Sequence, residues 1–149
     1  MNPFLSSRLY DEMTFYQAFI RDLESCRSEV FIESPYITAK RAEMLIPKFN
    51  DLLAKGVKIY VMTRDPNEHE ENMEYQSEKA ISIFERMGVQ VLLCISNHHR
   101  KLAILDRKIL WEGSLNILSQ NKSREIMRRI ESETTALEMF NFLKLQKFL

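Results

Sequence analysis

Residues 99–106 read HRKLAILD, and residues 113–116 follow as GSLN. Two short apolar runs, 102–105 and 109–111, lie on either side of the polar tip 106–108. Apolar runs around a short polar tip are typical of a β-hairpin. Because the tip contains no glycine, the sequence predicts a hairpin with a weak turn.

Basic side chains directly precede the first run of the hairpin. On a strand, residues two apart project from the same face, so His99 and Lys101 are predicted to point into one pocket. An imidazole beside an ammonium is costly in a core, because both groups lose solvation and repel each other when charged. The same pair is well suited to binding an anion.

Stretches of helix and strand character alternate before the hairpin. Helical spacing of apolar residues predicts three helices, at 10–25, 42–53 and 73–87. Runs of β-branched and apolar residues predict three strands, at 30–32, 57–62 and 89–95. The continuous apolar character of the last run is typical of a buried strand.

Local signals mark the ends of these elements. Gly56 and Gly88 are expected just after the second and third helices. Pro47 is expected to kink the second helix or to delay its start. After the hairpin, residues 125–130 predict a further strand. Thr135 and Glu138 stand in capping-box order before an apolar stripe, which predicts a C-terminal helix.

This alternation predicts one α/β domain over residues 1–149, with a central mixed sheet and helices on both faces. The chain is 45% hydrophobic with three glycines, a composition that excludes a disordered protein. Two cysteines at unrelated positions form neither a disulfide framework nor a zinc site. No apolar run approaches the length of a membrane span, and the N-terminus does not resemble a secretory leader, so we expect a cytoplasmic protein without a membrane partner.

The 21 basic and 21 acidic side chains cancel, which argues against a uniformly basic surface. They are unevenly distributed, however. Residues 64–79 carry a local charge of −4, whereas residues 98–129 carry eight basic and three acidic side chains, a local charge of +5. The basic region is either a solvated face or an electrostatic funnel for a polyanionic backbone.

The residues after the hairpin add groups that bind phosphate. Gly113 lets backbone approach closely, while the Ser114 hydroxyl and the Asn116 amide donate hydrogen bonds without adding charge. Glu125, if it folds back to the same pocket, would accept a hydrogen bond from one ring nitrogen of His99 and fix its tautomer. Together these residues would supply a nucleophile or base, groups that bind the phosphate oxygens, and a carboxylate that orients the imidazole.

At these positions the sequence resembles the phospholipase D superfamily. The superfamily's HxKxxxxD motif and its trailing GSxxN-like element are matched by His99, Lys101, Asp106, Gly113, Ser114 and Asn116. Over residues 28–131 the order of elements also resembles compact bacterial endonuclease-like members and single-motif modules attached to bacterial helicases and restriction enzymes. The resemblance implies a phospholipase D-like fold, but it does not fix the substrate.

The resemblance also implies a two-step phosphoryl transfer. His99 would attack phosphorus to form a phosphohistidine, and the histidine of a second motif would protonate the leaving oxygen and then activate water. Lys101 and Asn116, with Ser114, would hold the non-bridging oxygens, and Glu125 would orient His99. Asp106 is expected mainly to support the structure. The scheme requires no metal and no cofactor.

The chain carries one copy of the motif. His69 is followed two residues later by Glu71, and His98 by Arg100, so neither begins a second His-x-Lys pair. Because the superfamily's site uses two motifs, one chain is half a site, and we expect a homodimer that brings two copies of His99 together.

The remaining histidines and aromatic residues are less informative. We expect His98 on the opposite face from His99, and His69 in a solvated loop. Trp111 is predicted to lie in the core, whereas Tyr36 has a ring suited to stacking on bases.

Three functions fit the sequence. The first is a metal-independent nuclease acting on DNA or RNA. The second is a non-catalytic dimer that binds nucleic acid beside a helicase or restriction-system partner. The third, a hydrolase of phospholipids or other small phosphodiesters, is disfavoured by the missing membrane-binding segment.

Overall fold

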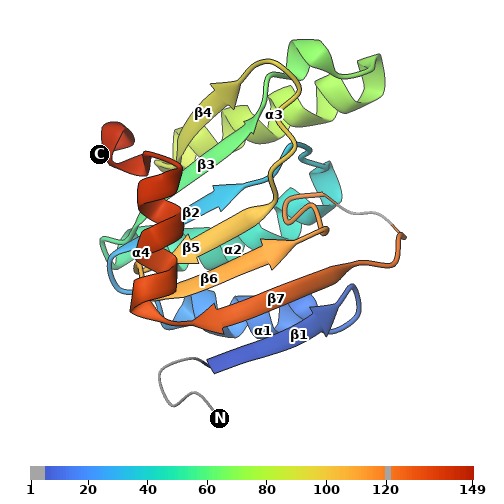
Figure 1. The fold of residues 1–149 in the computed structure, drawn as a ribbon. Coiled ribbons are helices and arrows are strands. Elements are labelled where there is room, and N and C mark those ends of the chain that lie inside the picture. Colours follow the sequence, from blue (N-terminus) through green and yellow to red (C-terminus); the bar gives the residue numbers. More distant parts are fainter. Residues whose placement is uncertain (1–5, 120–121) are drawn as a thin grey trace.

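The computed structural model describes residues 6–119 and 122–149, which form a seven-stranded sheet (Figure 1). The strand order is β1-β7-β6-β5-β2-β3-β4. Strands β2, β3 and β4 run parallel, whereas the other neighbouring strands are antiparallel, so the predicted mixed sheet is confirmed. The strands are β1 (Ser6–Asp11), β2 (Glu29–Glu33), β3 (Lys58–Arg64), β4 (Gln90–Cys94), β5 (Leu102–Leu105), β6 (Ile109–Gly113) and β7 (Ile126–Glu131).

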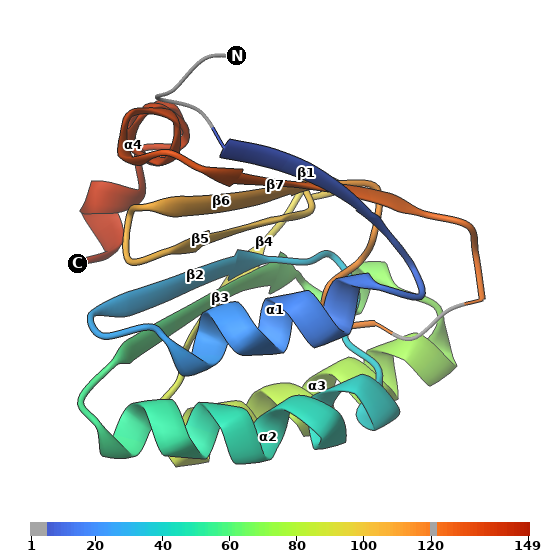
Figure 2. The ribbon, with the colours of Figure 1, turned by 90° about the horizontal axis from the view of Figure 1, so that it is seen from below.

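Helices cover both faces of the sheet, as predicted. Figure 2 shows α1, α2 and α3 on one face and α4 on the other. The described helices are α1 (Phe15–Glu24), α2 (Ala39–Ala54), α3 (Glu71–Met87) and α4 (Glu133–Phe142), with short 3-10 turns η1 (Pro66–Glu68) and η2 (Leu145–Phe148).

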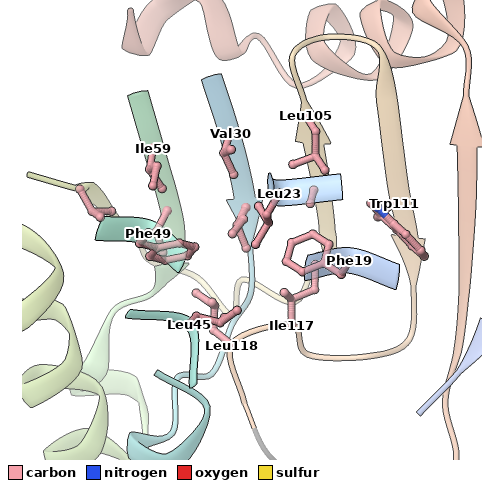
Figure 3. Close-up of a cluster of buried hydrophobic side chains, with 14 of the residues drawn as sticks. Phe19, Leu23, Val30, Leu45, Phe49, Ile59, Leu105, Trp111, Ile117 and Leu118 are labelled. Carbon is pink, nitrogen blue, oxygen red and sulfur yellow. The ribbon is translucent and has the colours of Figure 1, made fainter. Parts of the chain in front are cut away.

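The larger hydrophobic cluster fills the space between the sheet and α1–α3 (Figure 3). Trp111 of β6 is fully buried there, and its Nε1 donates a hydrogen bond to Asp22 at 2.8 Å. The predicted core position of Trp111 is therefore confirmed. A smaller cluster lies under α4, where the Phe31 ring stacks on Tyr60 and meets Phe140 edge-on.

The β5–β6 turn is supported by a distant segment of the chain. Asp106 and Arg107 adopt φ values of 53° and 54°, a left-handed conformation that aspartate tolerates better than most residues. The Asp106 carboxylate also accepts hydrogen bonds from the backbone N–H groups of Arg27, Ser28 and Glu29 at 2.8, 2.8 and 3.1 Å. A distant segment of the chain thus supports a turn that contains no glycine.

We predict that Asp106→Ala lowers the free energy of unfolding by about 3 kcal/mol, because three backbone donors lose a charged acceptor. Asp106→Asn should lose less, since its amide keeps one acceptor oxygen. Urea denaturation of both variants, with the exposed neighbour Lys108→Ala as control, measures the difference. Equal stability of Asp106→Ala and the control would contradict a supporting role.

Several boundaries differ from prediction. Strand β1 was not predicted; it adds an edge strand by pairing with β7, and the helix expected from residue 10 begins only at Phe15. Strand β4 is an edge strand with an exposed Leu93, so the expectation of a buried strand at 89–95 is wrong. Helix α2 contains Pro47 and begins at Ala39, which excludes a later start.

The ends of the helices are closer to prediction. Gly56 and Gly88 both adopt positive φ just after α2 and at the end of α3, as expected. The cap of α4 differs, because Ser132, and not Thr135, is the N-cap, and its hydroxyl accepts a hydrogen bond from the Thr135 N–H at 3.2 Å.

Candidate functional site

His99, Lys101, Gly113 and Ser114 meet at one end of strands β5 and β6. Antiparallel pairing places the start of β5, the end of β6 and the start of β7 together, with Leu102 opposite Glu112 and Gly113 opposite Met127. His99 and Lys101 precede β5 and do not lie within it, which corrects the strand position expected for them. The Gly113 N–H still bonds to the Lys101 carbonyl at 3.4 Å, so the hairpin ladder extends to Lys101.

A groove of about 820 Å³ opens at this end of the strands. His99, Lys101, Gly113 and Ser114 all line it, so four of the seven predicted site residues share one cavity. The His99 side chain is solvent-exposed. The Lys101 Nζ donates to the His99 backbone carbonyl at 2.8 Å, which keeps the ammonium beside the segment that carries the imidazole.

Ser114 is fixed to the first residue of β7. Its hydroxyl accepts a hydrogen bond from the Ile126 N–H at 3.0 Å, and its own N–H donates to the Ile126 carbonyl at 2.9 Å. Gly113 allows this close approach, because a Cβ there would stand 2.1 Å from the Ile126 carbonyl oxygen and 2.9 Å from the Met127 Cα. The backbone that approaches Gly113 is therefore strand β7.

The other three predicted residues lie outside the groove lining. Asn116 is half-buried, and its Oδ1 has no hydrogen-bond partner within residues 6–119 and 122–149. The Glu125 N–H donates to the Glu12 carboxylate at 2.8 Å, and in the described residues no hydrogen bond joins the Glu125 side chain to His99. The orienting role of Glu125 stays a prediction. Asp106 lies at the opposite end of β5, which fits structural support rather than contact with substrate.

The sequence analysis missed the groups that hold the loop before His99. Ser96 and Asn97 both adopt positive φ, and their N–H groups donate to the Glu68 carboxylate at 2.8 and 3.2 Å. These hydrogen bonds, that of Ser96 above all, lower the pKa of Glu68, and Arg64 bonds to both Glu68 and Asn97. Glu68 lies in a charged, Glu-rich stretch, so its sequence context does not indicate that it holds this loop.

His69 is half-buried against Tyr36, with ring centroids 4.9 Å apart, so the expected solvated position is wrong. Burial, and then the Arg64 charge, lower the pKa of His69. The Tyr36 ring in turn lies edge-on to His99, with centroids 6.2 Å apart. His98 is buried beside Glu33 and does not line the groove, in line with its expected position away from His99.

Ion pairs in the fold neutralise part of the positive charge of the basic region, residues 98–129. Three of its arginines are paired with carboxylates: Arg100 with Glu33, Arg107 with Glu29 and Arg129 with Asp22. The cations that line the groove without an ion pair in the described residues are Lys101, Arg124 and Arg128. Three unpaired cations therefore line the groove, together with one carboxylate, Glu112.

The described residues contain no group of three or more His, Cys, Asp or Glu side chains arranged to hold a metal ion. Both cysteines are free thiols; Cys26 is buried, which raises its pKa to about 12, and Cys94 is half-buried. Over the same part of the chain, no helix combines the length and apolar character needed to cross a membrane.

Residues 19–144 match the sequence model of the family described as "Cardiolipin synthase, PLD-like domain". Among solved structures, Nuc from Salmonella typhimurium, described as a phospholipase D family member, is 15% identical with a TM-score of 0.77; the match covers 94% of this chain and 92% of Nuc. NucT from Helicobacter pylori is 17% identical with a TM-score of 0.71, and 94% of each chain is covered. Phosphatidylserine synthase from Haemophilus influenzae gives 15% identity and a TM-score of 0.68, over 91% of this chain and 37% of the synthase. No curated protein sequence matches the chain.

Proposed function

Since this chain belongs to the phospholipase D-like family and is thus a phosphodiester-acting enzyme, we propose that it cleaves nucleic acid without a metal ion, through a phosphohistidine formed in a homodimeric site. One observation carries the proposal: His99, Lys101, Gly113 and Ser114 converge on a single groove, where the unpaired cations Lys101, Arg124 and Arg128 outnumber the one carboxylate, Glu112. The predicted fold and superfamily are confirmed by the match to the family. The substrate, the intermediate and the dimer are the proposed part.

In the proposed reaction a ring nitrogen of His99 attacks phosphorus, so a P–N bond forms and the bond to one ester oxygen breaks. The leaving oxygen takes a proton from the second histidine of the site. That histidine then removes a proton from water, which attacks phosphorus and restores free His99. The Lys101 ammonium stabilises the non-bridging oxygens as negative charge shifts onto them. Ser114 and Asn116 are proposed to add neutral donors.

A second copy of this chain is the proposed source of the second histidine. The groove that holds His99 continues over exposed apolar side chains: Leu9, Ile126 and Phe142 are 61, 63 and 78% exposed. Apolar residues gathered on one exposed surface are typical of a protein interface. A two-fold contact across this surface would cover them and bring two copies of His99 toward each other.

We predict that Phe142→Glu converts the dimer to monomers and lowers cleavage together with the dimer fraction, because a buried charge without a partner disfavours the interface. Analytical ultracentrifugation over a range of protein concentrations measures the change. Tyr75→Glu is the matched control, since Tyr75 is a similarly exposed aromatic residue on α3. A Phe142→Glu protein that stays dimeric would refute this interface.

Nucleic acid is favoured over a phospholipid by the cations along the groove, which suit a repeating phosphate backbone. The phospholipid alternative is supported by the family's description as a cardiolipin synthase domain. The non-catalytic alternative, a binding dimer beside a helicase or restriction partner, is disfavoured because His99 and Lys101 are both present and share the groove.

A substrate panel tests the proposal. The purified chain is incubated in EDTA with single-stranded DNA, duplex DNA, RNA and phosphatidylglycerol vesicles. We expect cleavage of at least one nucleic acid and no conversion of the lipid. Conversion of the lipid alone would replace nucleic acid with phospholipid as the substrate. Tight, salt-dependent binding of nucleic acid without any product would favour the non-catalytic alternative.

A further inference from the structure

Glu33 is a fully buried carboxylate that the proposed reaction does not use. It is the last residue of β2, beside the start of β5, and it is 0% exposed. Its Oε1 accepts a hydrogen bond from Arg100 Nε at 3.0 Å and lies 3.1 Å from His98 Nε2, without hydrogen-bond alignment to the imidazole. Its Oε2 has no hydrogen-bond partner in the described residues. A buried carboxylate is costly, and here its partners come from either side of His99.

The residues on either side of His99 are anchored to the sheet. His98 and Arg100 both reach Glu33, and Leu102 is buried in the hydrophobic cluster under α4. Holding His98 and Arg100 therefore restrains the backbone of His99, which lies between them.

We propose that Glu33 is a positioning residue: through His98 and Arg100 it holds the segment that presents His99 and Lys101. The segment lies between β4 and β5 and has no strand partners of its own up to Lys101. Glu68 holds its beginning through the Ser96 and Asn97 N–H groups, and Glu33 holds the part next to His99. The catalytic role of this positioning rests on the proposed function.

Glu33→Gln tests the proposal, because glutamine keeps the size of the side chain and removes the charge. Hydrogen–deuterium exchange of peptides covering residues 96–101 is expected to be faster than in the wild type. The kcat for cleavage is expected to fall by roughly tenfold to a hundredfold, since a displacement of about 1 Å at a reacting group is worth up to about 10²-fold. KM should stay within about twofold, because substrate contacts of the groove remain.

Glu29→Gln is the matched control. Glu29 begins the same strand, and its carboxylate is paired with Arg107 at 2.6 Å, at the end of the sheet away from His99. It should change neither the exchange of residues 96–101 nor kcat. If Glu33→Gln does not fold, Arg100→Gln takes its place in both measurements, since the Arg100 side chain is 55% exposed.

Unchanged exchange at 96–101 in Glu33→Gln overturns the proposal whether or not the chain cleaves nucleic acid. Faster exchange with an unchanged kcat overturns it as well. An equal loss of kcat in Glu33→Gln and Glu29→Gln would point to general destabilisation, and it would also overturn the proposal. If the wild type cleaves no phosphodiester, the proposed function fails, and the exchange data alone decide whether Glu33 holds the segment.

Discussion

His99→Ala is expected to lower EDTA-resistant cleavage by on the order of 10⁴-fold or more, because the variant lacks the proposed nucleophile. His99 is exposed in the groove and its side chain makes no hydrogen bond within the described residues, so its removal should leave stability nearly unchanged. The measurement is the initial cleavage rate of the best substrate from the panel, for wild type and variant at equal protein concentration.

The wild type should also carry a labelled nucleic-acid fragment, joined through an acid-labile, base-stable P–N bond, when it is quenched during turnover with labelled substrate, and His99→Ala should carry none. Binding of nucleic acid by the variant should remain and should weaken with salt, since Lys101, Arg124 and Arg128 are intact. Equal cleavage by both proteins, or cleavage that appears only with added divalent metal, would rule out the proposed mechanism.

The hairpin and the groove residues were predictable because their signals are local. The spacing between His99, Lys101, Gly113 and Ser114 can be read from the sequence without knowledge of tertiary contacts. Pairing of β5 with β6 then brings the four residues together. The contacts of Asp106 could not be predicted in this way. Its position in the motif was evident from sequence, but its three partners lie at residues 27–29, and no local pattern indicates them.

The pairing of charges in space was not predictable from sequence for the same physical reason. Summed along the chain, residues 98–129 form a strongly basic stretch, yet Arg107 and Arg129 are paired with carboxylates of β2 and α1. A linear sum of charges counts neighbours in sequence, whereas screening and pairing depend on distance in space. The edge strand β1 was missed on similar grounds, because its polar sequence becomes a strand only through pairing with β7.

Gly113→Ala is expected to lower the free energy of unfolding by about 3 kcal/mol, because backbone overlaps of this kind cannot be relieved by rotating a side chain. The added Cβ would overlap the Ile126 carbonyl oxygen at 2.1 Å and approach the Met127 Cα at 2.9 Å, so β7 must move away from β6. For a chain of this size the melting temperature should fall by roughly 10 °C. Urea and thermal denaturation measure both quantities.

Glu112→Ala is the control for Gly113→Ala, since it changes the preceding residue of the same strand and adds no atom near β7. Movement of β7 also displaces Ser114, whose hydroxyl and N–H are bonded to Ile126, so the loss of cleavage should exceed what the folded fraction explains. A Gly113→Ala protein as stable as the control would mean that β6 and β7 are free to separate at this point. In that case Ser114 is not held by the sheet, and its proposed role as a fixed donor to phosphate would have to be abandoned.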